Sequence, residues 1–422
     1  MSQNRREFLK VFVGATAWLS AGSSVPALLS RTAFAAAAER NSGENVLVVL
    51  QLAGGNDGLN TVVPYGDDHY AKNRFTLRLP EGRLHKIDSL VGFHPVMEPF
   101  MWLYQGGYLS VIQGVGYPNP SGAHPVSMRI WQTAATDPDS RQTGWLGRVV
   151  DRVWRPDETA VPAVFVGQIT QPFTLHAEKA IVPSLRTLGD WTLHGLAGVA
   201  GQFHRRRLEQ TAGMPRGGSD NALVEFVQRN TQAAYAVSRQ IEAVQAQAAG
   251  RAAEYPPLQL AGQLRTIAQL IRADVGIRIF LTELGGDGIG GFDNHANQRD
   301  NHAALLSQLS QSVAAFVDDL KRDNLLDRVL LMTYSEFGRT VRENGRRGTD
   351  HGSAAPLFLV GGKVKGGMIG PHPKLTELEG GGGLRHHTDF RRIYATVLDR
   401  WLGFDSEAVL GAKFEPLDVL KV

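Results

Sequence analysis

The chain has 422 residues and a formal net charge of +3, and its first 35 residues, with four basic and one acidic side chain, account for that whole surplus. The remainder is therefore close to neutral and lacks the basic surplus that binding to nucleic acid or to an anionic membrane requires. The absence of cysteine excludes disulfides, thiolate nucleophiles and cysteine-bound metal clusters, so any metal must use His, Asp, Glu or neutral oxygen ligands.

The first residues have the features of an export signal. Two adjacent arginines lie in the segment Asn4–Lys10, and an apolar stretch interrupted by glycine, serine and proline follows over Val11–Leu29. This order is typical of a twin-arginine signal, which exports proteins after they have folded. Ala33 and Ala35 form a small-x-small cleavage pattern, so we expect residues 1–35 to be removed, with a retained anchor as the alternative. The expected product is periplasmic or otherwise exported, and it meets the membrane only through its leader during export.

Short β-branched runs alternate with segments of helical periodicity along the rest of the chain. This alternation predicts an α/β fold with a mostly parallel central sheet and helices on both faces. The expected strands are Val46–Leu52, Leu109–Val115, Val161–Val166, Ile277–Leu284, Val329–Tyr334 and Leu357–Val360. The expected helices are Met97–Tyr104, Leu223–Ala249, Leu258–Arg272, Ala303–Leu320 and Asp389–Leu402.

The stretch from about Gly195 to Arg272 differs from its surroundings because it is rich in Ala and Gln and has few strand signals. Pro256 and Pro257 separate its two expected helices. We interpret residues 195–272 as a helical insertion or cap within one domain that spans residues 36–422.

Polar side chains follow several of the predicted strands. The carboxyl ends of parallel strands meet at one edge of a sheet, and ligands bind there. The candidates at this edge are Asp57, His124, Asp293, His295, Glu336, Asp350 and His351. Mixed carboxylate and imidazole ligands suit zinc or manganese, and mostly oxygen ligands suit magnesium or calcium.

Several of these residues also have a structural interpretation. Asp57 in Gly-Gly-Asn-Asp-Gly fits a turn or a helix cap, and Asp293 fits the N-cap of the helix that follows it. Glu336 could form a surface ion pair with Arg339 or Arg342. Arg339 suits either an anion clamp or a salt bridge.

Six further motifs follow the leader in a fixed order. They are Leu50–Pro64, Gly116–Pro120, Phe292–His295, Ser335–Thr340, Asp350–Gly352 and Thr388–Arg391. In these motifs the chain resembles the exported bacterial family known as domain of unknown function 1501, which is grouped with the alkaline phosphatase and sulfatase superfamily. The resemblance implies an alkaline phosphatase-like fold whose site holds two metal ions beside a Ser, Thr or modified-Cys nucleophile.

The same resemblance implies a set of metal ligands. These are Asp57, Asp293, His295, Glu336, Asp350, His351 and His387. Within this set Glu336 is an alternative to Asp293 for one carboxylate position, and His386 is an alternative to His387 for the last histidine. The ion itself is left open among zinc, manganese, magnesium and calcium.

The chain departs from the family pattern at the expected nucleophile. Relatives commonly show Ser-His-Phe-Arg where this chain reads Ala-His-Pro-Val, so Ala123 replaces the serine. Ser121 or Ser127 could substitute if the loop is re-registered, or water made more acidic by a bound cation could attack directly. The candidate catalytic residues are Ser127, His124 and Arg339.

These observations predict an exported metal-dependent hydrolase of phosphate or sulfate esters. Its substrate would be a small-molecule or polymeric anionic ester, and nucleic acid is not expected as a partner. The alternative is a non-catalytic metal-binding or assembly protein that keeps the fold and binds a protein partner.

Overall fold

The computed structural model describes residues 44–137, 139–153, 163–180, 182–187, 254–274, 276–285 and 291–422. The expected leader, the expected helix Leu223–Ala249 and most of the expected insertion lie outside these ranges. No helix within the described ranges is long and apolar enough to cross a membrane.

A nine-stranded sheet forms the centre of the molecule, with the strand order β11-β5-β10-β9-β1-β8-β6-β7 and β14 paired to β5. The strands are β1 (Val46–Leu52), β5 (Leu109–Gly116), β6 (Ala163–Val166), β7 (Ser184–Leu185), β8 (Ile279–Leu284), β9 (Val329–Tyr334), β10 (Ala355–Gly361), β11 (Gly367–Ile369) and β14 (Thr388–Asp389). Only β10 pairs antiparallel with its neighbours, β5 and β9, and the other pairs are parallel. The predicted α/β class with a mostly parallel sheet is confirmed.

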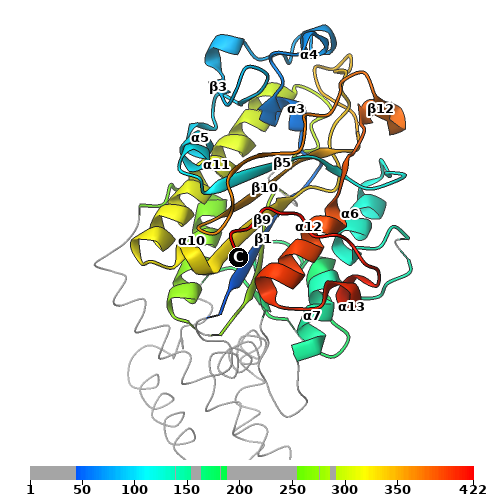
Figure 1. Cartoon of the computed structure of the whole chain (residues 1–422). Helices are drawn as coiled ribbons and strands as arrows, with labels where there is room; N and C mark the ends of the chain where they lie inside the picture. The colour runs from blue at the N-terminus through cyan, green and yellow to red at the C-terminus, as the bar shows by residue number, and fades with distance from the viewer. Residues whose placement is uncertain are drawn as a thin grey trace, which may run out of the picture.

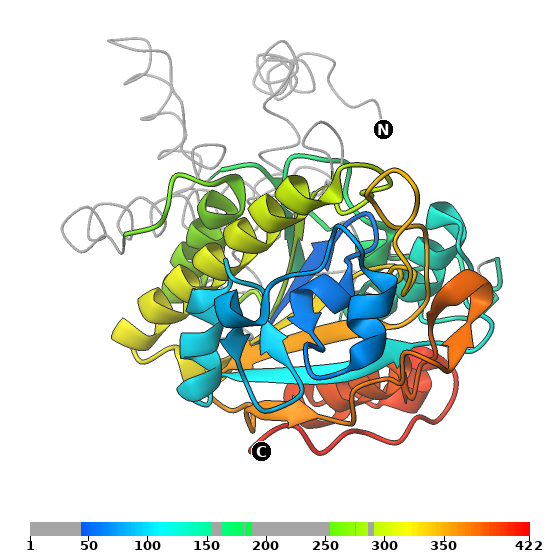
Figure 2. The ribbon, with the colours of Figure 1, turned by 90° about the horizontal axis from the view of Figure 1, so that it is seen from above.

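Helices cover both faces of this sheet, as Figures 1 and 2 show from the side and from above. One face carries α5 (Glu98–Gln105), α10 (Gln259–Arg272) and α11 (Gln298–Arg322). The other carries α6 (His124–Thr133), α7 (Trp145–Val153), α12 (Phe390–Thr396) and α13 (Ser406–Leu410). In β1, Val48 and Leu50 belong to the first core and Leu47 and Val49 to the second, because successive side chains of a strand point to opposite faces. Such a strand is buried on both sides and reads as a continuous apolar run.

A smaller group of elements lies over the carboxyl edge of β1, at the top of Figure 1. It contains α3 (Gly58–Thr61), α4 (Asp68–Asn73) and a three-stranded sheet of β2 (Val62–Val63), β4 (Gly92–Phe93) and β3 (His85–Lys86). A hairpin of β12 (Leu378–Glu379) and β13 (Gly383–Leu384) is separate. The 3-10 helices are η1 (Glu81–Arg83), η2 (Phe173–Leu175), η4 (Leu326–Arg328) and η5 (Gly380–Gly382).

The observed elements differ from the predicted ones in several places. The predicted helices do not include α6 or α7, which are only ten and nine residues long. The expected helix Asp389–Leu402 consists of α12 followed by the π-helical segment η6 (Val397–Leu402), and Asp389 is the N-cap. Finally, α10, at the end of the expected insertion, packs against α11, β6 and β8 as part of one helical layer.

The direction of β10 decides which residues meet at the carboxyl edge of the sheet. Because β10 runs opposite to the other strands, the residues that lead into it arrive at the edge where β1, β5, β8 and β9 end. The loops after those four strands and the segment before β10 therefore converge.

Candidate metal centre

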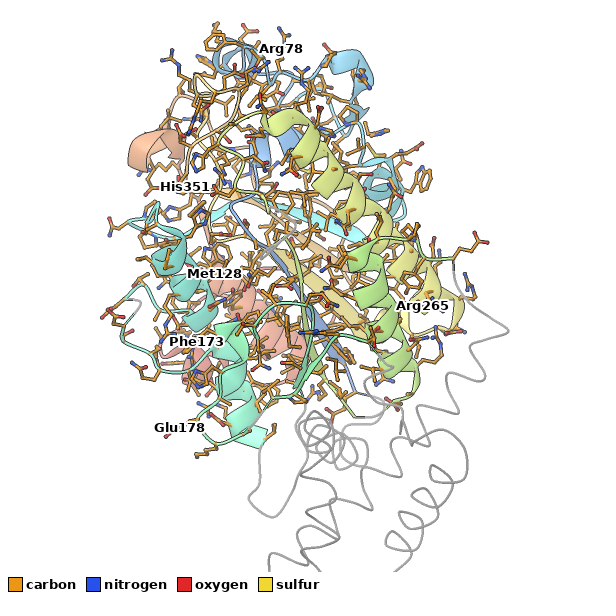
Figure 3. The ribbon with its side chains drawn as sticks, turned by 180° about the vertical axis from the view of Figure 1, so that it is seen from behind. Arg78, Met128, Phe173, Glu178, Arg265 and His351 are labelled. Atoms are coloured by element: carbon orange, nitrogen blue, oxygen red, sulfur yellow. The ribbon has the colours of Figure 1, made fainter. Side chains whose placement is uncertain are left out.

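The carboxylate of Asp293, in the loop between β8 and α11, lies among three imidazoles. Its Oδ1 is 3.0 Å from Nε2 of His295 and 3.1 Å from Nε2 of His351, and these two nitrogens are 2.9 Å apart. Its Oδ2 is 3.4 Å from Nε2 of His124, the first residue of α6. His124, Asp293 and His351 each offer a ligand atom within 4.8 Å of the others. Figure 3 places His351 above Met128, which belongs to α6.

In each of these histidines the other ring nitrogen, Nδ1, forms a hydrogen bond with an oxygen atom. The pairs are His124 with Oε1 of Glu336 (2.9 Å), His295 with Oδ1 of Asp350 (3.0 Å) and His351 with the carbonyl of Gly122 (2.6 Å). Carbonyl and ionised carboxylate oxygens only accept hydrogen bonds, so each Nδ1 carries the proton. A neutral imidazole then presents the Nε2 lone pair to Asp293, which is how metal-binding histidines are usually oriented.

This arrangement fits a cation. Lone pairs and a carboxylate oxygen that meet at 2.9–3.4 Å repel one another unless a proton or a metal ion lies between them. Nε2 of His124 is buried and has no hydrogen-bond partner among the described residues. Ligand atoms about 2.1 Å from a tetrahedral zinc ion lie roughly 3.4 Å apart. The imidazole-rich set suits zinc, manganese or a similar transition metal better than magnesium or calcium.

Arg339, a predicted catalytic residue, is buried and holds Asp293 in place. Its Nη2 donates to Oδ1 of Asp293 at 2.7 Å. The other acceptors of its guanidinium are the carbonyls of Gly54, Gly55 (2.8 Å), Phe292 (3.0 Å) and Thr349 (3.1 Å). The structure therefore gives Arg339 a positioning role and does not direct it toward a substrate anion.

The surroundings set the proton affinities of two of these groups. Burial alone would raise the pKa of Asp293, but the hydrogen bond and the positive charge of Arg339 outweigh it and lower the pKa to about 2. The hydrogen bond to Glu336 raises the pKa of His124 above its usual value, against the opposing effect of burial. Asp293 is therefore an anion over the whole physiological range, ready to bind a cation.

Two glycines let the loop after β1 approach the centre. Gly54 has a φ of +111°, and a Cβ there would lie 2.5 Å from the backbone nitrogen of Asp293. Gly55 has a φ of +83°, and its Cβ would lie 2.4 Å from the ring of Phe337. Positive φ and this close approach both require glycine. The amide of Gly54 donates to Glu336, which also holds His124.

Asp57, the predicted first ligand, does not join the cluster. It is buried, and the guanidinium of Arg74 contacts it through two nitrogens, Nη1 to Oδ2 at 2.5 Å and Nη2 to Oδ1 at 2.9 Å. Nε2 of Gln298 also donates to Oδ2. Burial by itself would raise the pKa of Asp57, but Arg74 outweighs it and the pKa is lowered.

Two other predicted site residues also lie apart from the cluster. Ser127 is fully buried in α6, where its hydroxyl contacts Tyr117 and donates to the carbonyl of Glu336. A substrate therefore has no access to this hydroxyl. His387 has its ring nitrogens 3.0 Å from the hydroxyl of Thr388 and 2.8 Å from the carbonyl of Pro371.

Glu336 and Asp350, both predicted as ligands, lie on the side of their histidines that faces away from Asp293. Each accepts from the Nδ1 of a histidine that points toward Asp293. Sequence reasoning missed Arg74 and Gln298, which engage Asp57, and Phe337, whose ring lies 4.8 Å and 4.6 Å from those of His124 and His351. Only Phe337 carries a sequence signal, because it lies inside the Ser335–Thr340 motif.

The chain belongs to the family described as "Protein of unknown function (DUF1501)", whose profile matches residues 111–412. No curated protein sequence matches it. Among solved structures, it is similar to the zinc-complexed C-terminal periplasmic domain of EcEptC from Escherichia coli, with 11% identity, 76% of this chain and 74% of the other covered, and a TM-score of 0.35. It is also similar to the PsFucS1 sulfatase from Pseudoalteromonas sp., with 11% identity, 92% and 74% covered, and a TM-score of 0.35. A third likeness is to a mutant of TAB5 alkaline phosphatase with magnesium in its M3 site, with 12% identity, 76% and 92% covered, and a TM-score of 0.33.

Replacing Arg74 by methionine tests the buried ion pair. The Arg74→Met change leaves the Asp57 carboxylate buried without its counter-charge, so we expect the free energy of unfolding to fall by about 3–5 kcal/mol. Urea unfolding measures it. The double variant Asp57→Asn/Arg74→Met should lose less than the sum of the single changes. A loss below about 1 kcal/mol in Arg74→Met would contradict the pairing.

The low pKa of Asp293 predicts acid sensitivity of the metal-free chain. Because its folded pKa of about 2 lies below an unfolded value of about 3.9, its contribution to stability is present above pH 4 and is lost as the pH falls through 2. The free energy of unfolding, measured between pH 4 and pH 2, should therefore decrease less steeply in Asp293→Asn than in the parent chain. Equal slopes would show that Asp293 has no favourable partners in the folded state.

Proposed function

We propose that this protein is an exported, divalent-metal-dependent hydrolase of phosphate or sulfate esters. The observation that supports it most directly is the arrangement around Asp293. Three imidazoles point Nε2 at one carboxylate, and each Nδ1 is held by an oxygen. Such an arrangement maintains three metal-binding lone pairs at a fixed place.

The residues of the site have separate tasks in this proposal. Nε2 of His124, His295 and His351, with the Asp293 carboxylate, would hold the ion. When bound, a divalent cation supplies Lewis-acid chemistry, which polarises an ester oxygen and makes water more acidic. The side chains of Glu336 and Asp350 and the carbonyl of Gly122 fix the imidazole rings.

The nucleophile in this proposal is water. Ala123, at the position where relatives commonly have serine, is exposed immediately before α6 and has no hydroxyl. The hydroxyl of Ser127 is buried and bonded to the carbonyl of Glu336. Direct attack by water, with no covalent intermediate on serine, is compatible with both facts.

Export is the second part of the proposal, and it rests on the sequence. Arg5 and Arg6 precede the apolar stretch of the leader, and export after folding allows an ion to be loaded beforehand. We expect the Arg5→Lys/Arg6→Lys double variant to remain in the cytoplasm, as shown by fractionation and immunoblotting. Unchanged export of that variant would contradict the twin-arginine route.

The exposed Ala123 and the buried Ser127 also favour a second candidate, a non-catalytic protein that binds metal and takes part in assembly. Such a protein needs the cluster around Asp293 and no nucleophile. The two candidates agree on metal content and differ in turnover.

Metal content of the purified exported protein tests what the two candidates share. We expect bound zinc or manganese by inductively coupled plasma mass spectrometry in the parent chain. His351→Ala should lose the ion, because it removes a proposed ligand. Nε2 of His351 lies 2.9 Å from Nε2 of His295 and 3.1 Å from Oδ1 of Asp293, which are also proposed ligands. Glu336→Gln should weaken binding by roughly 10–100-fold, because it alters the partner of His124.

A matched control is His387→Ala, which removes a histidine outside the cluster and should leave the metal content unchanged. A parent chain without metal, or equal metal loss in both histidine variants, would overturn the proposal. Hydrolysis of aryl phosphates and aryl sulfates by the metal-loaded parent would then decide between the candidates. Turnover that disappears in His351→Ala supports the hydrolase, and bound metal without turnover supports the second candidate.

A further inference from the structure

The number of metal ions at the site follows from the carboxylates that remain around it. A second ion about 3.5–4 Å from the first would need ligands of its own. Among the described residues, the carboxylates beyond Asp293 that are linked to the cluster or expected in it are Asp57, Glu336 and Asp350. Their present partners bear on whether the described part of the site can hold two ions.

Asp57 is not available. Its two oxygens accept from Arg74 and Gln298, and the side chain is almost completely buried. Arg74 is itself held by the carbonyls of Val341 (2.8 Å) and Thr340 (3.0 Å), so its guanidinium is fixed over the carboxylate. The pair is a neutral unit, and a metal ion would have to displace a buried cation to reach Asp57.

Glu336 and one oxygen of Asp350 are engaged as well. Glu336 is buried and accepts from the amide of Gly54 at 2.9 Å and 3.1 Å, in addition to His124. Oδ1 of Asp350 accepts from His295 and from Nδ2 of Asn344, both at 3.0 Å. If either carboxylate moved to a second ion, a histidine of the first ion would lose its orientation.

The charge around the centre also disfavours a second ion. The buried guanidinium of Arg339 lies 2.7 Å from Oδ1 of Asp293. This fixed positive charge shares the carboxylate with any ion in the cluster. A second divalent ion beside the same carboxylate would be repelled by both charges.

We propose that the site binds a single divalent transition-metal ion, and that the Arg74 guanidinium takes the place of a second ion as the partner of Asp57. This inference rests on the proposed metal-binding function. It differs from the two-ion site that the family resemblance implies, because Asp57, one of the carboxylates expected to bind metal, is already paired with an arginine.

The count of ions tests the inference on the unmodified exported protein. The chain is loaded with excess Zn²⁺, desalted and examined by native mass spectrometry together with elemental analysis. We expect one zinc per chain. Two tightly held ions would overturn the single-ion inference and leave the proposed function standing, whereas no ion would overturn the proposed function itself.

X-ray absorption at the zinc edge gives a second measurement on the same sample. We expect nitrogen-rich scattering from imidazoles and no zinc–zinc distance of about 3.5–4 Å. A zinc–zinc distance in that range would overturn the inference.

The double variant Asp57→Asn/Arg74→Met removes the buried pair as a neutral unit. It should keep one zinc per chain, as the parent does, because Asp57 is not a ligand. Circular dichroism checks that the double variant folds. Loss of zinc from the folded variant would show that Asp57 binds metal, and it would overturn the assignment of Arg74 as the partner of Asp57. The mass and absorption measurements on the parent do not depend on whether this variant folds.

Discussion

The buried guanidinium of Arg339 holds the loops of the site together. Arg339 follows β9, yet it donates to carbonyls in the loop after β1, in the loop after β8 and in the segment before β10. It also bonds the carboxylate of Asp293. A planar cation with several fixed donors can join separate backbone segments in this way, and lysine cannot. The geometry around Asp293 therefore depends on a buried arginine.

The strands could be predicted from sequence because they are buried on both faces. Val46–Leu52 and Val329–Tyr334 are apolar except for Gln51 and Thr333, and the structure has them with the same bounds. The direction of β10 could not be predicted, since an apolar strand of Ala355–Gly361 has the same composition whichever way it runs. That direction brings Asp350 and His351 to the carboxyl edge.

The sequence also predicted which residue types would meet, but not the task of each. A motif such as Asp350-His351-Gly352 marks a polar segment near a strand end. Whether a carboxylate faces the centre or supports a histidine depends on distances of a few ångströms between loops. The partner of Asp57 shows the same limit, because Arg74 follows α4 and nothing in its local sequence indicates a buried ion pair.

The Asp57–Arg74 pair is better understood as fixing the position of a loop than as adding stability. Taking two charges out of water costs free energy that their attraction only partly returns, and an apolar pair of similar volume is often as stable. An apolar pair, however, could not also bind the carbonyls of Thr340 and Val341, as Arg74 does. These contacts tie the loop after β1 to the segment that follows Arg339. The imidazole of His124 is held separately, by Glu336, which in turn accepts from the amide of Gly54. The buried pair thus holds the loop after β1 against the segment that follows Arg339, and Glu336 orients the imidazole.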